Sequence, residues 1–202
     1  MEYLGHELSC EGVRPVERLV TAVKGFPRPT DPAEVKRFVH LAGYYRKFVE
    51  AFGSIMVPLT RLLRKDVDWQ WTAEQQFAFE RVKMMLTTKP LLIYPNFELP
   101  FRLVTDARKV GLGACLMQDV GYGWQPVAFA SKVNSPAEMN YSITELECLA
   151  VVWSVKLFRS QLYGSSFTIV TDHAALKWLM TRTNPRAGCI SGRSLSKSTT
   201  LR

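Results

Sequence analysis

The chain of 202 residues is 47% hydrophobic and 22% charged, with a formal net charge of +8. This composition is that of an ordinary globular protein with one large or two small domains. No apolar run reaches membrane-spanning length and no signal-like segment follows Met1, so we predict a cytoplasmic or nuclear protein without a membrane partner. The four cysteines are far apart and the three histidines lack zinc-ligand spacing, which disfavours a disulfide scaffold and a zinc site.

The positive charge is concentrated at one end of the chain. Residues 186–202 carry four Lys or Arg and no acid, whereas residues 1–96 have a net charge of +3 and residues 97–185 of +1. Half of the excess therefore lies in the last 17 residues. Basicity alone is weak support for a nucleic-acid surface on the rest of the chain.

Residues 1–14 have the pattern of a short β-hairpin. Gly5 follows the apolar Tyr3-Leu4 pair, and Glu11-Gly12 is a turn signal. The helical pattern begins after this hairpin, with Pro15 at a first helical position and Gly25 as a stop signal.

A second predicted helix begins at Asp31, which is a good N-cap and forms a capping-box pattern with Glu34. Apolar residues keep helical spacing from there to Gly53. A shorter helical piece, "MVPLTRLLRKD", follows. Thr72 and Gln75 form another capping-box pattern, which opens a last helix before Lys89-Pro90.

Basic and aromatic residues are interleaved on these helices. Solvated faces of a helical bundle explain the pattern, and so does a surface that tracks phosphates. The sequence leaves both open for the following residues: Lys36, Arg37, Tyr44, Tyr45, Arg46, Lys47, Phe48, Arg61, Arg64 and Lys65.

The periodicity changes at residue 97. Three strand-like runs, "LPFRLVTDA", "GLGACLMQ" and "WQPVAFASK", predict an antiparallel meander. A long helix over "SITELECLAVVWSVKLFRSQLYG", a fourth strand "SFTIVTD" and a short helix "HAALKWLM" follow. We predict an α/β domain with a mixed sheet and a crossover helix, whose fourth strand runs parallel to the first.

Two of these strands end on an acid. Asp106 closes the first strand and Asp172 the fourth, so parallel pairing brings them to one sheet edge about 5 Å apart. The crossover helix adds Glu145 or Glu147 from its first turn. Carboxylates this close repel one another unless protonated or bridged by cations. Oxygen ligands suit Mg²⁺, and two such ions about 4 Å apart form the usual arrangement for phosphodiester cleavage.

Each acid also has a purely structural explanation. Aspartates often end strands and begin turns. Glu147 can complete a capping box with Thr144, and Glu145 can do so with Ser142. The order Asp, Glu, Asp on strand, crossover helix and strand favours the metal site.

Three blocks that contain these acids resemble the RNase H domain of reverse transcriptases from gypsy-type long-terminal-repeat retrotransposons. They are "FRLVTDARKVGLGACLMQ", "QPVAFASKVNSPAEMNYSITELECLAVVWSVKLFRSQLYG" and "FTIVTDHAALKWLM". Upstream, "YLGHELSCEGVRP" is similar to the primer-grip hairpin at the end of the polymerase palm. "VKRFVHLAGYYRKFV", "MVPLTRLLRKD" and "WTAEQQFAFERVKMML" resemble the thumb and linker. The resemblance covers about residues 2–185 in collinear order.

The resemblance implies a palm-end hairpin over 1–14, a thumb and linker over 15–96 and an RNase-H-like domain over 97–185. The implied activity is metal-dependent hydrolysis of RNA in RNA–DNA hybrids during reverse transcription, with Mg²⁺ or Mn²⁺ as cofactor and the rest of the Pol polyprotein as partner. The family's catalytic acids, which are also its metal ligands, fall on Asp106, Glu147 and Asp172. The "ECLAVVW" context selects Glu147 over Glu145.

The chain also departs from the family pattern. Arg108 stands where a small Ser is usual, and can pair with Asp106 or contact a phosphate. The polymerase "YxDD"-type motif is absent, so we expect no DNA polymerisation. A fourth family acid is absent as well, because no Asp or Glu follows Asp172. The alternatives to a hybrid nuclease are therefore a catalytically inactive nucleic-acid-binding remnant and an unstable pseudogene product.

Residues 186–202, "RAGCISGRSLSKSTTLR", have neither helical nor strand period and contain no aromatic residue. We interpret them as an out-of-frame, disordered tail, which leaves the RNase-H-like domain incomplete at its C-terminal end. Reading the DNA in the shifted frame tests this interpretation.

Overall fold

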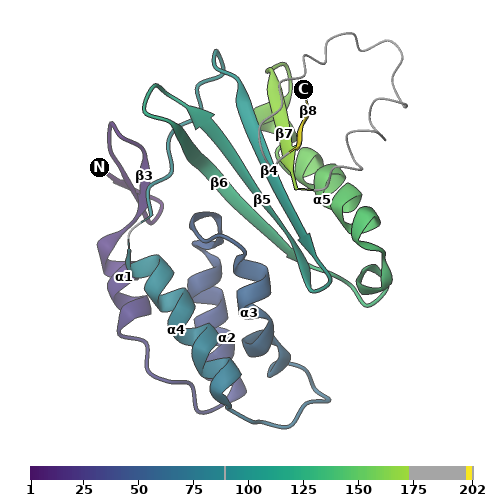
Figure 1. Ribbon diagram of the computed structural model, residues 1–202. Coiled ribbons are helices and arrows are strands. Elements are labelled where there is room, and N and C mark those ends of the chain that lie inside the picture. The colour runs from purple at the N-terminus through teal and green to yellow at the C-terminus, as the bar shows by residue number, and fades with distance from the viewer. Residues whose placement is uncertain (89, 173–198, 202) are drawn as a thin grey trace. The chain divides into compact units, whose positions relative to one another are not determined.

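The backbone of the computed structural model divides between Tyr94 and Pro95 into two units with separate secondary structure (Figure 1). The structure describes residues 1–88, 90–172 and 199–201. The change in periodicity predicts that the first region ends at residue 96, and the first unit of the structure ends two residues earlier, at Tyr94. None of the helices in these described ranges is both long and apolar enough to cross a membrane.

The first unit opens with a small antiparallel sheet of three strands, β1 (Glu2–Tyr3), β2 (His6–Leu8) and β3 (Val13–Pro15). The predicted hairpin thus gains a strand. The predicted helix start at Pro15 is wrong, because Pro15 pairs with His6 as the end of β3. The chain stays extended at Val16, and the helix begins at Glu17.

Four α-helices and a short 3₁₀ turn complete the first unit, and two of them begin at the predicted caps. Asp31 accepts a 2.7 Å hydrogen bond from the backbone N–H of Glu34, and Thr72 and Gln75 form a reciprocal capping box. The elements are α1 (Glu17–Lys24), α2 (Pro32–Gly43), η1 (Arg46–Phe48), α3 (Phe52–Arg61) and α4 (Ala73–Thr87).

The single predicted helix from Asp31 to Gly53 is wrong. Helix α2 ends at Gly43, and Ala51 adopts a left-handed conformation with φ of 52° before α3 begins. Buried apolar residues lie on both sides of the break, Phe38 and Phe48 among them. The apolar residues therefore keep a helical spacing along the sequence through this break, although the backbone there is not one continuous helix.

The second unit is built on a mixed sheet in the order β6-β5-β4-β7-β8. Strands β4, β5 and β6 form the predicted antiparallel meander, and β7 pairs parallel to β4, as predicted. Their bounds are β4 (Phe101–Arg108), β5 (Gly111–Asp119), β6 (Trp124–Val133), β7 (Phe167–Thr171) and β8 (Thr199–Leu201).

Helix α5 (Ile143–Leu157) is the crossover between the meander and β7, and it packs against the sheet (Figure 1). A 3₁₀ turn, η2 (Glu138–Asn140), precedes it and α6 (Arg159–Leu162) follows. Leu146 and Ala150 are fully buried against Ala107 and Leu112 of the sheet. Leu157, the last residue of α5, is 52% exposed.

The predicted short helix "HAALKWLM" lies outside the described residues, as does most of 186–202. Residues 199–201 depart from the expectation of a disordered tail, because they form β8 antiparallel to β7. The pairing gives backbone partners to the side of β7 that faces away from β4.

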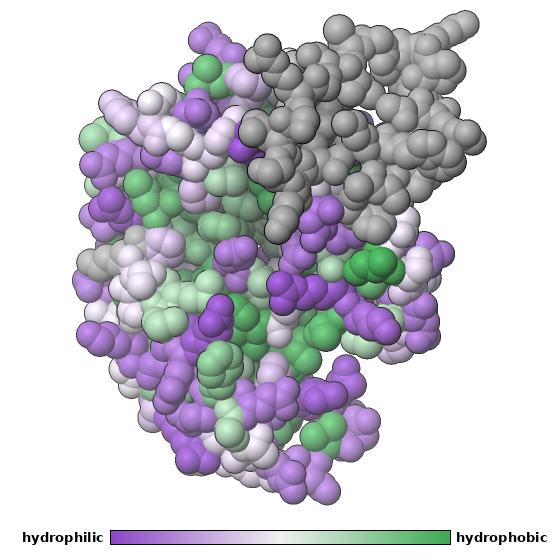
Figure 2. All heavy atoms as spheres, in the orientation of Figure 1, coloured by the Kyte–Doolittle hydropathy of each residue, from purple (hydrophilic) through white to green (hydrophobic). Residues whose placement is uncertain are grey.

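Figure 2 shows hydrophilic side chains interspersed with apolar ones on the visible face of the molecule. Several large apolar side chains of the first unit are exposed, including Tyr44, Phe77 and Met84. Scattered exposure of this kind is normal on a protein surface and by itself indicates no binding site.

Candidate active site

Parallel pairing of β4 with β7 brings Asp106 and Asp172 to the same sheet edge. The register pairs Phe101 with Phe167 and continues one residue at a time to Val104 and Val170. The same step places Asp106 opposite Asp172, and neighbouring strands lie about 5 Å apart. Both aspartates are exposed. The predicted convergence of the two acids therefore follows from the strand register.

Glu147 joins the two aspartates from α5. One ligand oxygen from each of Asp106, Glu147 and Asp172 lies within 4.8 Å of the other two. Unlike the aspartates, Glu147 is only 2% exposed. The structure thus brings together all three acids that the sequence singles out.

Two hydrogen bonds hold the buried Glu147 carboxylate. Thr171 donates from Oγ1 to Oε2 at 3.2 Å, and the Ala107 backbone also hydrogen-bonds this carboxylate. Burial and then the charge of Asp172 outweigh these bonds and raise the pKa of Glu147 to about 7. Without a cation, the buried carboxyl group therefore resists ionisation.

Glu145 has the capping role that the sequence left open for either glutamate. Its carboxylate accepts hydrogen bonds from the backbone N–H and the hydroxyl of Ser142, both at 2.8 Å. These bonds lower the pKa of Glu145. The capping box of α5 thus uses Glu145 with Ser142, and Glu147 faces the two aspartates instead.

Sequence reasoning missed Thr171 as part of this site. The residue is 1% exposed and stands directly before Asp172. A signal was present, because the dipeptide Thr-Asp closes both strands, as Thr105-Asp106 and Thr171-Asp172. Of these two hydroxyls, that of Thr171 donates to Glu147, whereas the buried Thr105 hydroxyl has no hydrogen-bond partner in the described part of the chain.

Arg108, for which the sequence left open a pairing with Asp106 or a contact to a phosphate, forms an ion pair with Asp106. Its Nε lies 3.2 Å from Oδ2 of the aspartate, and both side chains are mostly exposed. Across the strand pair, Gly113 stands opposite Asp106 and Gly111 opposite Arg108. No side chain of β5 therefore projects beside the ion pair at these two positions.

The basic and aromatic residues of the first unit do not form an open stacking surface. Tyr45 and Phe48 are buried at 1% and 3% exposure, and only Tyr44 of the three rings is exposed. The hydroxyl of Tyr45 donates to the Gly5 carbonyl at 2.6 Å, which ties it to the small sheet. These two rings explain the aromatic part of the pattern as core packing, while most of the interleaved cations remain exposed.

A cavity of about 900 Å³ lies at the opposite end of β4 from the acids. Phe101, Arg102, Trp124 and Phe167 are among its lining residues, and the guanidinium of Arg102 stacks 3.7 Å above the ring centre of Trp124. Asp106 lies five residues along the strand from Phe101, roughly 16 Å away. The acids are therefore at a surface edge and this cavity is separate from them.

A known protein family matches the chain from just before α4 in the first unit to β7 in the second. Residues 71–169 match the family described as "RNase H-like domain found in reverse transcriptase". The matched range contains Asp106 and Glu147 and ends three residues before Asp172.

Curated relatives match over most of this chain. It is 38% identical over 183 residues to the retrovirus-related Pol polyprotein from transposon 412 and 39% identical over 187 residues to that from transposon 297, both of Drosophila melanogaster. It is 34% identical over 181 residues to the transposon Tf2-3 polyprotein of Schizosaccharomyces pombe. These matches cover 87% to 92% of this chain but only 13% to 17% of the relatives.

Solved structures share the fold. The foamy viral protease-reverse transcriptase dRH in complex with double-stranded DNA has a TM-score of 0.76 at 18% identity, over 94% of this chain and 34% of that one. The foamy viral protease-reverse transcriptase in complex with an RNA/DNA hybrid has a TM-score of 0.74 over 95% and 26%. The sequence matches show that residues 71–169 belong to the RNase H-like domain family of reverse transcriptases, and that most of the chain is homologous to Pol polyproteins of transposons that include 412, 297 and gypsy.

Proposed function

We propose that the second unit hydrolyses the RNA strand of RNA–DNA hybrids during reverse transcription of a retrotransposon. The observation that carries this proposal is the clustering of Asp106, Glu147 and Asp172 within 4.8 Å. The Pol polyproteins among the relatives and the foamy viral enzyme in complex with a hybrid support this substrate. Because the chain spans a small part of those polyproteins, we propose that it acts together with the remainder of one.

The donor set suits a hard divalent cation. All three groups are carboxylates, and Mg²⁺ and Mn²⁺ prefer oxygen ligands. A cation also offsets the two causes that raise the pKa of Glu147, burial and the charge of Asp172. We propose Asp106, Glu147 and Asp172 as catalytic residues and as ligands of Mg²⁺ or Mn²⁺, which when bound activates water and stabilises the departing 3′-oxygen.

The three acids contribute differently because their surroundings differ. Thr171 and the backbone of Ala107 fix Glu147 in one orientation at the rear of the cluster. Asp106 and Asp172 are exposed, so they are the acids that a nucleic-acid backbone approaches. The site therefore combines one rigid, buried ligand with two that face the substrate.

A cleavage assay on the full chain tests the proposal. With fluorescent RNA annealed to DNA and Mg²⁺ or Mn²⁺ present, we expect cleavage of the RNA, and at least about a 100-fold loss in Asp106→Asn. Glu147→Gln should be similarly impaired. Glu145→Gln is the matched control on the same helix, and we expect its rate to stay within about twofold because Glu145 only caps α5.

Two outcomes would contradict the nuclease. Salt-sensitive binding of the hybrid without cleavage would identify a non-catalytic nucleic-acid-binding protein. Cleavage that persists in both Asp106→Asn and Glu147→Gln would show that the carboxylate cluster does not carry the activity.

A further inference from the structure

Arg108 places a positive charge at the edge of the carboxylate cluster. It is the last residue of β4, and its side chain is 78% exposed against 56% for Asp106. Alternate residues of a strand project to the same side, so Asp106 and Arg108 share one face of β4. The ion pair of 3.2 Å between them is thus set by the strand and needs no loop to bring the groups together.

The neighbouring strand leaves this pair unobstructed. Gly113 and Gly111 are the cross-strand partners of Asp106 and Arg108. A Cβ at Gly113 would lie 3.8 Å from the carbonyl oxygen of Asp106, so a side chain would fit there. Because both partners are glycines, no side chain at either of these β5 positions competes with the guanidinium for the aspartate.

Arg108 also stands apart from the other cations of the chain. Within the ranges 1–88, 90–172 and 199–201, no other Lys or Arg forms an ion pair with any of the three acids. The guanidinium contacts Oδ2 of Asp106, an oxygen that a divalent cation at the cluster would also attract. A divalent cation bound to Asp106 would therefore compete with Arg108 for the same carboxylate.

We propose that Arg108 is a competing counter-ion of Asp106 that lowers the affinity of the cluster for divalent cations. The inference rests on the proposed function, because it assumes that Asp106, Glu147 and Asp172 bind the cation. The chain then needs a higher Mg²⁺ concentration for occupancy than the same carboxylates without Arg108. An exposed ion pair contributes little energy, so the effect on the dissociation constant is about two- to fivefold.

Calorimetric titration of the full chain with Mg²⁺ at low salt, without nucleic acid, tests this role. We expect Arg108→Ser to bind Mg²⁺ about two to five times more tightly than the wild type. Arg108→Lys should lie between the two, because a lysine keeps the charge and loses the planar donor. Raising the salt concentration should reduce the difference, because the pair is exposed.

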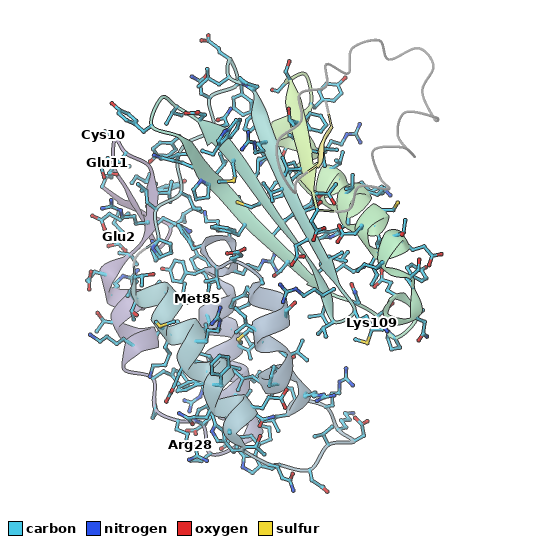
Figure 3. The ribbon with its side chains drawn as sticks, in the orientation of Figure 1. Glu2, Cys10, Glu11, Arg28, Met85 and Lys109 are labelled. Atoms are coloured by element: carbon cyan, nitrogen blue, oxygen red, sulfur yellow. The ribbon has the colours of Figure 1, made fainter. Side chains whose placement is uncertain are left out.

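Lys109→Ser is the matched control. Lys109 lies next to Arg108 in the turn between β4 and β5 (Figure 3), and this variant removes the same charge without touching the ion pair. We expect its affinity for Mg²⁺ to equal that of the wild type. An equal gain in Arg108→Ser and Lys109→Ser would overturn the proposal in favour of a general effect of charge.

The remaining outcomes separate this inference from the proposed function. Equal Mg²⁺ affinities in the wild type and Arg108→Ser, with binding lost in Asp106→Asn, would overturn the role of Arg108 and leave the metal site standing. Weaker hybrid binding in Arg108→Ser at unchanged Mg²⁺ affinity would assign Arg108 to a phosphate instead. Absence of Mg²⁺ binding in every variant would overturn the metal site and the inference with it.

Discussion

Thr171 donates a 3.2 Å hydrogen bond from Oγ1 to Oε2 of Glu147, which links the last residue of β7 to the second turn of α5. Both residues are almost fully buried. A buried carboxylate that loses a donor keeps the cost of its desolvation. The bond therefore stabilises the fold and also orients the acid.

Thr171→Val removes this donor with almost no change of shape. We expect the metal-free chain to lose about 1–3 kcal/mol of unfolding free energy at pH 8, measured by urea denaturation. The loss should be smaller at pH 4.5, where the carboxyl group holds a proton. Thr168→Val on the same strand should stay within about 0.5 kcal/mol of the wild type. Equal losses in the two variants would contradict the role of the bond.

The raised pKa of Glu147, about 7, predicts a pH dependence of stability without metal. Near pH 4.5 the Glu147 carboxyl group of the folded chain is protonated. As the pH rises, this group loses its proton in the unfolded chain at a lower pH than in the folded chain. Unfolding is therefore favoured progressively between about pH 4.5 and 7. We expect Glu147→Gln to match the wild type at pH 4.5 and to be more stable by up to about 3 kcal/mol at pH 8 in EDTA. Saturating Mg²⁺ should remove this advantage.

Glu145→Gln should show the opposite sign, which makes it the control for the pH series. Hydrogen bonds from Ser142 lower the pKa of Glu145, so its ionised form stabilises the folded chain above its ordinary pKa. That contribution to stability is lost as the pH falls through the lowered pKa of Glu145. We expect Glu145→Gln to be less stable than the wild type at pH 7 and to approach it in acid. Parallel curves for both variants would show that neither carboxyl group behaves as described.

Gly12 of the first unit has no room for a side chain. Its φ is 143°, and a Cβ there would lie 2.2 Å from the carbonyl oxygen of Leu92, which accepts a hydrogen bond from Val13. We expect Gly12→Ala to cost about 2–4 kcal/mol in thermal or urea unfolding. Gly43→Ala at the end of α2 has open space around it and should be neutral or stabilising by up to about 1 kcal/mol. Similar values for both would contradict the clash.

Gln118 fixes the segment that leads into β4. Its fully buried amide accepts from the Asn96 N–H at 2.8 Å and donates to the carbonyls of Asn96 and Leu99 at 2.7 and 3.0 Å. Gln118→Met keeps the volume and removes all three hydrogen bonds, after which the Asn96 carbonyl keeps only the bond from the Leu99 N–H. We expect a loss of about 2–4 kcal/mol by urea unfolding. A cost below about 0.5 kcal/mol would show that the backbone finds other partners.

The candidate site was largely predictable because it depends on strand order and register. The alternation in β4 and β7 fixes which residues end the strands, and parallel pairing then aligns Asp106 with Asp172. The choice between Glu145 and Glu147 was different. Both fit a helix start, so the residue pattern left the choice open and only the resemblance to the family selected Glu147. The capping contacts of Glu145 with Ser142 are visible only in the structure.

Other features depend on tertiary contacts that the local pattern does not contain. The break between Gly43 and Phe52 was hidden because the buried residues keep a helical spacing through it. The burial of Tyr45 against the small sheet could not be read from its basic neighbours. The partner of Arg108 also required coordinates, since its side chain is long enough for either candidate.

Strand β4 lies between two neighbours, and β5 pairs with all of its residues from Phe101 to Arg108. Backbone amides in such a strand exchange with deuterated solvent only when most of the sheet opens. We expect the amide of Asp106, which lies within β4, to exchange at this slow rate, whereas Asp172 follows the last residue of β7. We expect deuterium to enter at Asp172 well before Asp106, so that local opening separates Asp172 from the other two acids first.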